Sequence, residues 1–181
     1  MLFILLAGAL LTGLARRGKV SNLAKIHLMH PWLIFLSILL EISLIMLSRY
    51  NVALAWSFVF MFISIQYIFL LAFIWVNRHL PYSRLIGLGS FLNCLVILLN
   101  KGTMPLAPAY LNLNRAKLSY DFLVNGNLPL YHIIDENTVL WFLGDIIRIP
   151  YPFSAFMSIG DIILYAGVFL MLQSLIAGKR A

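Results

Sequence analysis

Five apolar stretches alternate with short polar or basic segments along the chain. They cover Leu2–Leu14, Pro31–Leu47, Val52–Val76, Leu85–Leu99 and Phe153–Ile176. A helix needs about 20 mostly apolar residues to cross a bilayer, and the longest stretches reach that length. The first and fourth are shorter, so we expect them to extend into their flanks or to cross where the bilayer is thin. The pattern predicts an all-α, polytopic integral membrane bundle of about five transmembrane helices.

The composition is typical of a membrane protein. Of the 181 residues, 62% are hydrophobic and only 10% are charged, and the mean hydropathy is +0.96. A soluble domain of this size has too little interior to bury so many apolar side chains. The net charge of +7 falls in short clusters beside the apolar stretches. This arrangement favours the lipid bilayer as the partner and argues against nucleic acid.

The sequence carries no signature of a metal or a cofactor. The single cysteine, Cys94, excludes an internal disulfide and a multi-cysteine metal site. It contains no metal-ligand spacing, no glycine-rich phosphate loop and no nucleophile elbow. We therefore expect any chemistry to depend on the side chains of the protein itself, with no metal and no cofactor.

The basic residues predict an orientation for a multi-pass protein of the cell membrane. Placing the N-terminus outside puts eight of the 13 Lys and Arg residues in the cytoplasm. These eight are Arg16, Arg17, Lys19, Lys25, Arg78, Arg84, Lys179 and Arg180. Because cytoplasmic loops are enriched in Lys and Arg, we expect the N-terminus outside and the C-terminus in the cytoplasm.

This orientation divides one domain into three parts. Residues 1–100 hold four spans, residues 101–152 form an extracytoplasmic interfacial cap, and residues 153–181 form the last transmembrane helix with a basic tail. An amphipathic helix at the membrane surface is predicted by the helix-compatible spacing of Leu111, Leu118 and Phe122, with Arg115 and Lys117 between them. Asp135–Asn137 precede a second expected short helix at Thr138–Leu143.

Asp161 is the first candidate for chemistry, because it interrupts the apolar stretch Phe153–Ile176. At about 1.5 Å per residue it is expected about 12 Å below the start of that span. An acid at membrane depth costs about 2.5–3.5 kcal/mol, which makes it a functional candidate. Glu41 and Asn93 are expected at a similar depth on other helices, so the three side chains are expected to converge on one interior site. The alternative is that they only form hydrogen bonds between packed helices.

Asp145 is the second acid, and its surroundings resemble those of Asp161. The two segments read Leu143-Gly144-Asp145-Ile146-Ile147 and Ile159-Gly160-Asp161-Ile162-Ile163. The proline-containing connector Arg148–Pro152 would let Asp145 fold back over the start of the last span. Two neighbouring carboxyl groups that share a water are the working parts of an aspartyl hydrolase. The alternative is that Asp145 only caps a helix or forms a turn.

The segment Asn100-Lys101-Gly102 closes the fourth stretch at the same membrane face. Asparagine and glycine are typical of a tight turn after a helix. The functional alternative has Asn100 and Gly102 position a substrate beside the acids.

Two family resemblances follow from these motifs. The Asn100–Pro105 turn, Leu143-Gly144-Asp145 and Ser158-Ile159-Gly160-Asp161 resemble a DUF5317-like family of small bacterial multi-pass membrane proteins, which implies no activity. The C-terminal half is also similar to signal peptidase II, the aspartyl lipoprotein signal peptidase. That resemblance implies an aspartate dyad at Asp145 and Asp161, with Asn100-Lys101-Gly102 as its Asn-x-Gly turn. The chain departs from that family at Ser158, where asparagine is expected, and lacks a full span between Asn100 and Asp145.

Three functional hypotheses result. The first is a membrane-embedded aspartyl hydrolase that cleaves a membrane-tethered substrate with Asp145 and Asp161. The second is a non-catalytic subunit or scaffold that binds a protein partner in a membrane complex. The third is a proton- or cation-coupled transport element that uses Glu41 and Asp161.

Overall fold

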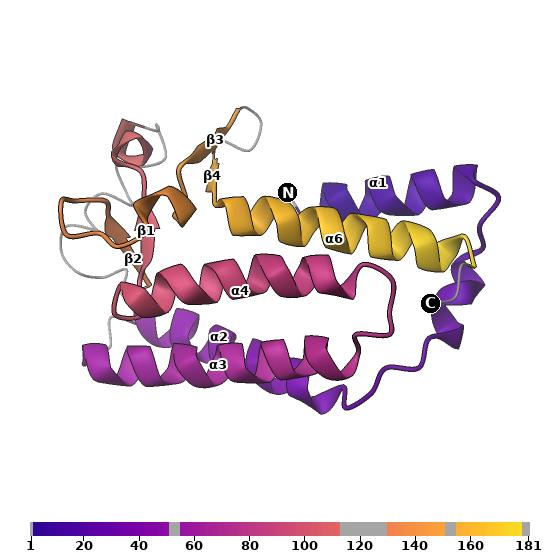
Figure 1. Cartoon of the computed structure of the whole chain (residues 1–181), viewed down its shortest axis with the longest axis horizontal. Helices are drawn as coiled ribbons and strands as arrows, with labels where there is room; N and C mark the ends of the chain where they lie inside the picture. The colour runs from indigo at the N-terminus through magenta and orange to yellow at the C-terminus, as the bar shows by residue number, and fades with distance from the viewer. Residues whose placement is uncertain (1, 51–54, 113–129, 151–154, 179–181) are drawn as a thin grey trace.

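The computed structural model describes residues 2–50, 55–112, 130–150 and 155–178. Within these ranges the chain is mostly helical and forms one bundle in which it runs back and forth (Figure 1). The long helices are α1 (Leu2–Ala15), α2 (Trp32–Arg49), α3 (Trp56–Val76), α4 (Ser83–Leu99) and α6 (Ile159–Ile176). Each lies within or close to one of the predicted apolar stretches, so the hydrophobic pattern located the helices correctly.

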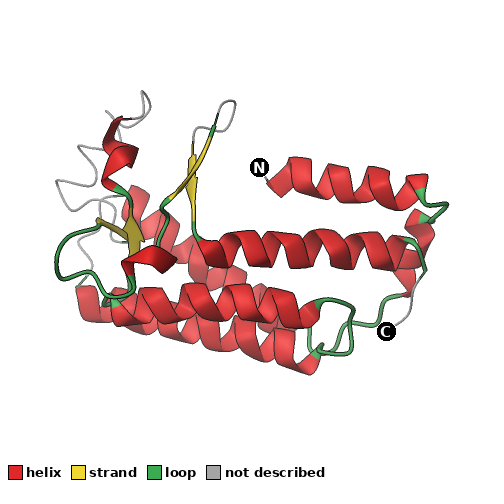
Figure 2. Cartoon of the chain, turned by 45° about the horizontal axis from the view of Figure 1, so that its top comes forward, coloured by secondary structure: helices red, strands yellow, loops and turns green. Residues whose placement is uncertain are grey.

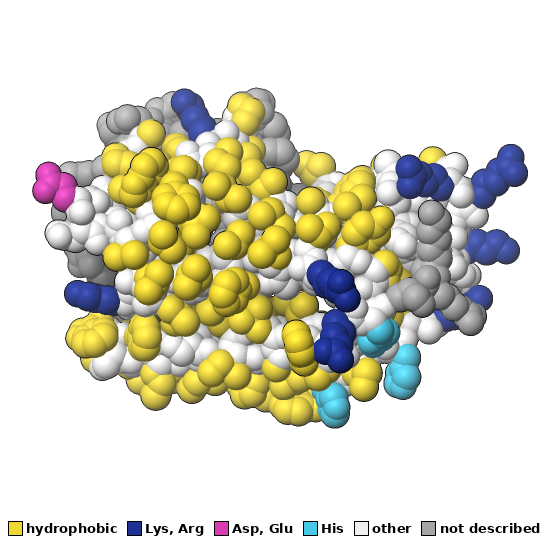
Figure 3. Space-filling model, viewed as in Figure 1, with side chains coloured by type: hydrophobic (Ala, Val, Ile, Leu, Met, Phe, Trp, Pro, Cys, Tyr) yellow, Lys and Arg dark blue, Asp and Glu magenta, His cyan; other side chains and the backbone are white. Residues whose placement is uncertain are grey.

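Two of these helices, α3 and α6, are long and apolar enough to cross a membrane. The other three are apolar but shorter. Large apolar side chains cover much of the surface in view (Figure 3), and Phe35, Trp56 and Ile68 are each more than 60% exposed. An apolar surface of this extent is the arrangement expected of helices that face lipid.

One end of the bundle carries short strands, so the prediction of an all-α fold is wrong there (Figure 2). Strand β1 (Met104–Leu106) pairs in parallel with β2 (Tyr131–Ile133), and β3 (Ile147–Ile149) pairs antiparallel with β4 (Ala155–Met157). Each strand has three residues. A strand that short is below the four to eight residues that periodicity can reveal.

The start of the last helix also differs from the prediction. The apolar stretch begins at Phe153, but Ala155–Met157 form β4 and α6 begins only at Ile159. Ser158 is the N-cap: its hydroxyl accepts a hydrogen bond from the Asp161 backbone at 2.8 Å. Asp161 therefore lies in the first turn of α6, and the predicted depth of about 12 Å below the helix start is wrong.

In its described residues, the segment between α4 and α6 contains 3-10 turns. They are η2 (Pro108–Asn112) and η3 (Trp141–Leu143), and a further turn, η1 (Val20–Lys25), follows α1. Only the last three residues of the predicted helix Thr138–Leu143 are helical. Of the predicted amphipathic helix, Leu111 belongs to η2, and Leu118 and Phe122 lie outside the described residues.

Helix α4 packs most extensively against α6, and glycines allow the close approach. A Cβ atom at Gly89 would lie 2.5 Å from both the Gly160 carbonyl oxygen and the Leu164 amide nitrogen. At Gly167 a Cβ atom would lie 2.9 Å from the Ile86 amide nitrogen. The backbones of α4 and α6 are therefore in direct contact, as in membrane helix pairs with small residues at the interface.

Candidate functional site

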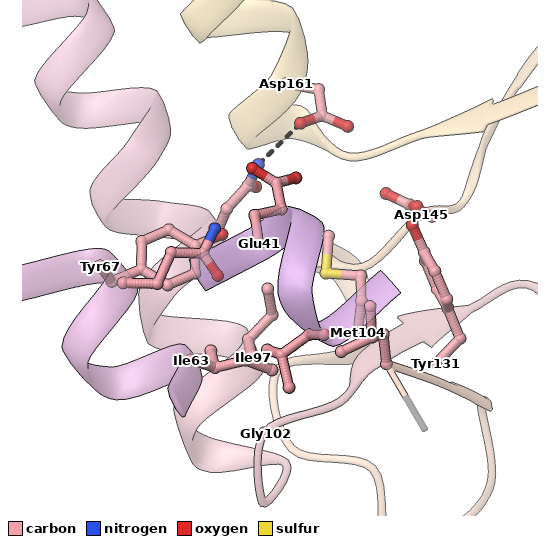
Figure 4. A pocket seen from close by; sticks show the side chains of 13 residues that line it. Glu41, Ile63, Tyr67, Ile97, Gly102, Met104, Tyr131, Asp145 and Asp161 are labelled. Atoms are coloured by element: carbon pink, nitrogen blue, oxygen red, sulfur yellow. Dashed lines mark hydrogen bonds between the residues drawn. The ribbon is translucent and has the colours of Figure 1, made fainter. Parts of the chain in front are cut away.

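A cavity of about 210 Å³ lies at the strand-bearing end of the bundle (Figure 4). Three of the lining residues are acids, Glu41, Asp145 and Asp161, and they come from α2, from the segment before β3 and from α6. The carboxyl groups of all three point toward a common space in Figure 4. No Lys, Arg or His is among the described residues that line this cavity.

Asp161 is fixed by hydrogen bonds on two sides. Asn93 on α4 donates from Nδ2 to Asp161 Oδ1 at 2.7 Å. The Ser158 backbone amide donates to Asp161 Oδ2 at 3.4 Å, which completes a reciprocal capping box. The positive end of a helix stabilises a negative side chain by about 0.3–1 kcal/mol. The start of α6 therefore holds Asp161 at the rim of the cavity as a hydrogen-bond acceptor.

Asn93 is itself oriented by α6. The Ser158 hydroxyl donates to Asn93 Oδ1 at 2.8 Å, which leaves Asn93 Nδ2 directed at Asp161. Any Cβ atom at Gly160 would collide with Asn93 Oδ1, so the glycine makes room for this contact. Both Asn93 and Ser158 are buried. The small Gly160 next to Asp161 therefore lets the Asn93 side chain approach the Asp161 carboxyl group.

Asp145 is positioned by its backbone. Its amide donates to the Pro105 carbonyl at 2.8 Å, and its own carbonyl accepts from the Ala107 amide at 3.1 Å. The preceding Gly144 has no side chain to push β1 away, because a Cβ atom there would lie 2.6 Å from the Pro105 carbonyl oxygen. The second Gly-Asp pair therefore also depends on close backbone packing, here against β1.

Strands β3 and β4 bring the two aspartates to the same cavity. Ile147 pairs with Met157 at one end of this ladder. Asp145 comes just before Ile147, and Asp161 follows Met157 in the first turn of α6. Of the proline-containing connector, Arg148 and Ile149 belong to β3, and Tyr151 and Pro152 lie outside the described ranges.

The Asp145 carboxyl group is buried and poised to hold a proton. The residue is only 9% exposed, and its Oδ1 atom is buried without a hydrogen-bond partner among the described residues. Burial, and secondly the negative charge of Asp161, raise the pKa of Asp145 to about 7. A carboxylic acid with a pKa near 7 is a suitable proton donor at neutral pH.

The other predicted site residues divide into two groups. Glu41 and Asn93 line the same cavity as Asp161. Gly102 also lines it, with φ +89°, a conformation that favours glycine. Asn100 is not among the lining residues. Its amide group bonds to the backbone of Val139 in both directions, at 2.8 and 3.0 Å, so it ties the loop to the end of α4.

Three further polar residues line the cavity and were not predicted from the sequence: Gln66, Tyr67 and Tyr131. Gln66 is buried in α3, and an amide inside so apolar a stretch is a signal that could have identified it. Tyr131 lies on β2, which has no recognisable sequence pattern. Burial, and then the charge of Asp145, raise the pKa of Tyr131, so its hydroxyl stays protonated.

Within the described ranges, no three His, Cys, Asp or Glu side chains are grouped so that they could hold a metal ion.

The family comparison gives one match. A family model described as a family of unknown function (DUF5317) matches residues 25–173. The chain belongs to the DUF5317 family. The DUF5317 match encloses every residue that lines the cavity, from Glu41 to Asp161, whereas α1 precedes it.

No curated protein and no solved structure matches this DUF5317 protein. The similarity to signal peptidase II therefore stays a prediction from the sequence.

Proposed function

We propose that this DUF5317 protein is a multi-pass membrane hydrolase that cleaves a membrane-tethered substrate with the pair Asp145 and Asp161. The single observation that carries the proposal is that both carboxyl groups border one cavity, where burial and Asp161 raise the pKa of Asp145 to about 7. Asp145 lies in a site that favours its protonated form, whereas Asp161 accepts hydrogen bonds from the Asn93 side chain and the Ser158 backbone, and this difference supports assigning Asp145 as the acid and Asp161 as the base.

In the proposed reaction Asp161 is the base and Asp145 is the acid. Asp161 takes one proton from a water molecule, and the water oxygen adds to the carbonyl carbon of an amide bond. Asp145 gives its proton to the amide nitrogen as the carbon–nitrogen bond breaks. The products are a carboxylic acid and an amine, and return of the proton from Asp161 to Asp145 restores the site. Asn93 would keep Asp161 in position during these steps.

The membrane arrangement is part of the proposal. All five long helices cross the bilayer, and the cavity opens near the extracytoplasmic surface. The length and apolarity of α3 and α6 support this arrangement directly, and the shorter α1, α2 and α4 would cross with the help of flanking residues.

The test compares Asp145→Asn and Asp161→Asn with the unchanged protein in cells. Membrane fractions are analysed by mass spectrometry for peptides with new termini close to a membrane anchor. We expect such fragments with the unchanged protein and at least a hundredfold fewer with either variant, because each removes one partner of the proton transfer. Glu136→Gln, at an exposed acid outside the cavity, is the matched control. If both aspartate variants produced as many fragments as the unchanged protein, the proposal would be overturned.

A second candidate is cation-coupled transport, favoured by Glu41, which borders the same cavity. An acid on α2 has no task in the reaction above but would serve in a cation path. Flux of protons or sodium into proteoliposomes tests this candidate. A transporter requires that Glu41→Gln reduces flux more than Asp145→Asn does.

A further inference from the structure

The ionisable side chains that line the cavity include three acids. Glu41, Asp145 and Asp161 approach it from three different parts of the chain, and none of the described lining residues is basic. A concave site lined by one sign of charge concentrates ligands of the opposite sign. The acids are also too dispersed to form a metal-binding group among the described residues.

An independent observation indicates that a ligand completes the site. Asp145 is nine-tenths buried and directed into the cavity (Figure 4), yet its Oδ1 atom has no hydrogen-bond donor among the described residues. Buried polar atoms are nearly always satisfied, so an orphaned acceptor needs an explanation. The carbonyl oxygen of a protonated carboxyl group still accepts a hydrogen bond. A donor group on a bound molecule would satisfy Oδ1 without removing the proton of Asp145.

The volume of the cavity and its aromatic side chains further restrict the class of ligand that could bind. At about 210 Å³ it is smaller than the roughly 300–1,000 Å³ typical of pockets for drug-sized molecules. Tyr67 and Tyr131 contribute aromatic rings to the lining. Acidic groups together with aromatic rings are the environment that binds organic cations.

We infer that the cavity binds an ammonium group on a short alkyl chain, and that Glu41 is the carboxylate that pairs with it. Glu41 is the acid that the proposed hydrolysis does not use, so it is free to determine specificity. The ammonium hydrogens would also reach Asp145 Oδ1. The inference rests on the proposed function in one respect, because that function leaves Glu41 without a role in the hydrolysis.

The first experiment measures binding without turnover. The purified protein is placed in phosphatidylcholine nanodiscs, and n-butylammonium is titrated and followed by ligand-observed NMR. Neutral n-butanol, which has the same chain length, is titrated in parallel. We expect n-butylammonium to bind at least tenfold more tightly than n-butanol. Equal binding of the two would overturn the inference, and this comparison requires no variant.

The second experiment assigns the binding to Glu41. Glu41→Gln keeps the shape and removes the charge, so n-butylammonium should bind at least fivefold more weakly. Glu41→Asp keeps the charge and should retain more binding than Glu41→Gln. Glu136→Gln, at an exposed acid outside the cavity, should bind as the unchanged protein does. Unchanged binding in Glu41→Gln would overturn the role of Glu41.

The ammonium group has two possible sources, a lipid headgroup or a water-soluble amine. Adding phosphatidylethanolamine to the nanodiscs separates them. Weaker apparent binding of n-butylammonium would identify the lipid headgroup as a competitor, and unchanged binding would identify a soluble amine.

Failure of this inference can be distinguished from failure of the proposed function. Ammonium binding in a protein whose fragments do not depend on Asp145 overturns the hydrolase and leaves the ligand class standing. Cleavage that depends on both aspartates, in a protein that binds n-butylammonium and n-butanol equally, overturns the ligand class and leaves the hydrolase standing.

Discussion

Asp145 has a pKa near 7 in the folded protein, against an ordinary value of 3.8, chiefly because it is buried. Between these two values the folded state binds a proton that the unfolded state releases. The free energy of unfolding therefore falls as the pH rises from about 4 to about 7, and the loss is complete above the folded pKa. A shift of this size corresponds to about 4 kcal/mol.

We therefore predict that Asp145→Asn stabilises the fold at pH 8 while it abolishes hydrolysis. Asparagine is neutral at every pH, so the variant should unfold at a higher temperature than the unchanged protein at pH 8, with a gain of up to about 4 kcal/mol. At pH 4 the two proteins should be nearly equal, because Asp145 is then protonated in the fold. Thermal unfolding in detergent at both pH values measures the difference. A variant that is less stable at both would contradict this account of Asp145.

The sequence identified most of the acids and amides at the site for a physical reason. Glu41, Asn93 and Asp161 stand out because polar side chains are costly in apolar stretches. Asp145 stood out through its repeated Gly-Asp context, and both glycines prove to be points of tight packing. Asn100 was a weaker candidate, because a turn former satisfies its own loop, as its bonds to Val139 illustrate.

At the scale of elements, apolar periodicity located the helices but not the start of α6. Apolar residues continue from Phe153 through β4, so hydrophobicity alone cannot separate strand from helix. The pattern Ser158-x-x-Asp161 is a capping-box signature and marks the true start. The short strands depend on contacts distant in sequence, such as Met104 with Tyr131. Local pattern does not encode such contacts.

The contact between α4 and α6 predicts opposite effects for two glycine substitutions. Gly89→Ala would force its Cβ atom to within 2.5 Å of backbone atoms of α6, so the helices must separate. We expect a loss of about 1–3 kcal/mol in the free energy of unfolding, because backbone cannot move aside as a flexible side chain does. Gly8→Ala is the matched control, since its nearest neighbour is a Phe169 ring carbon at 3.6 Å. That variant should gain about 0.5–1 kcal/mol from better helix propensity.

An activity assay provides a second measurement for the two variants Gly89→Ala and Gly8→Ala. Because Gly89 contacts Gly160 and Asn93 lies on the same face of α4, separation of the helices should also displace Asn93 from Asp161. Gly89→Ala should then lose activity as well as stability, whereas Gly8→Ala should keep both. Full stability of Gly89→Ala would contradict the direct backbone contact.

At the scale of the whole molecule, the two ends of the bundle differ in chemistry. The strands and the cavity occupy one end. The other end is tied together by a hydrogen bond from the Lys19 amide to the Ile176 carbonyl at 2.9 Å, and by Asn77, whose side chain bonds to the Met29 backbone. Lys and Arg side chains gather toward this second end (Figure 3). The end where these basic side chains gather is the end that the positive-inside rule predicts to face the cytoplasm.

The orientation can be tested by labelling single cysteines in a Cys94→Ser background. Glu136→Cys reports on the strand-bearing end and Lys25→Cys on the basic end, and both native side chains are exposed. A membrane-impermeant maleimide added to intact cells should label Glu136→Cys at once and Lys25→Cys only after permeabilisation. The reverse pattern would place the cavity at the cytoplasmic surface. A hydrolase acting on substrates anchored at the outer surface would then be excluded, because the cavity and its acids lie at the strand-bearing end.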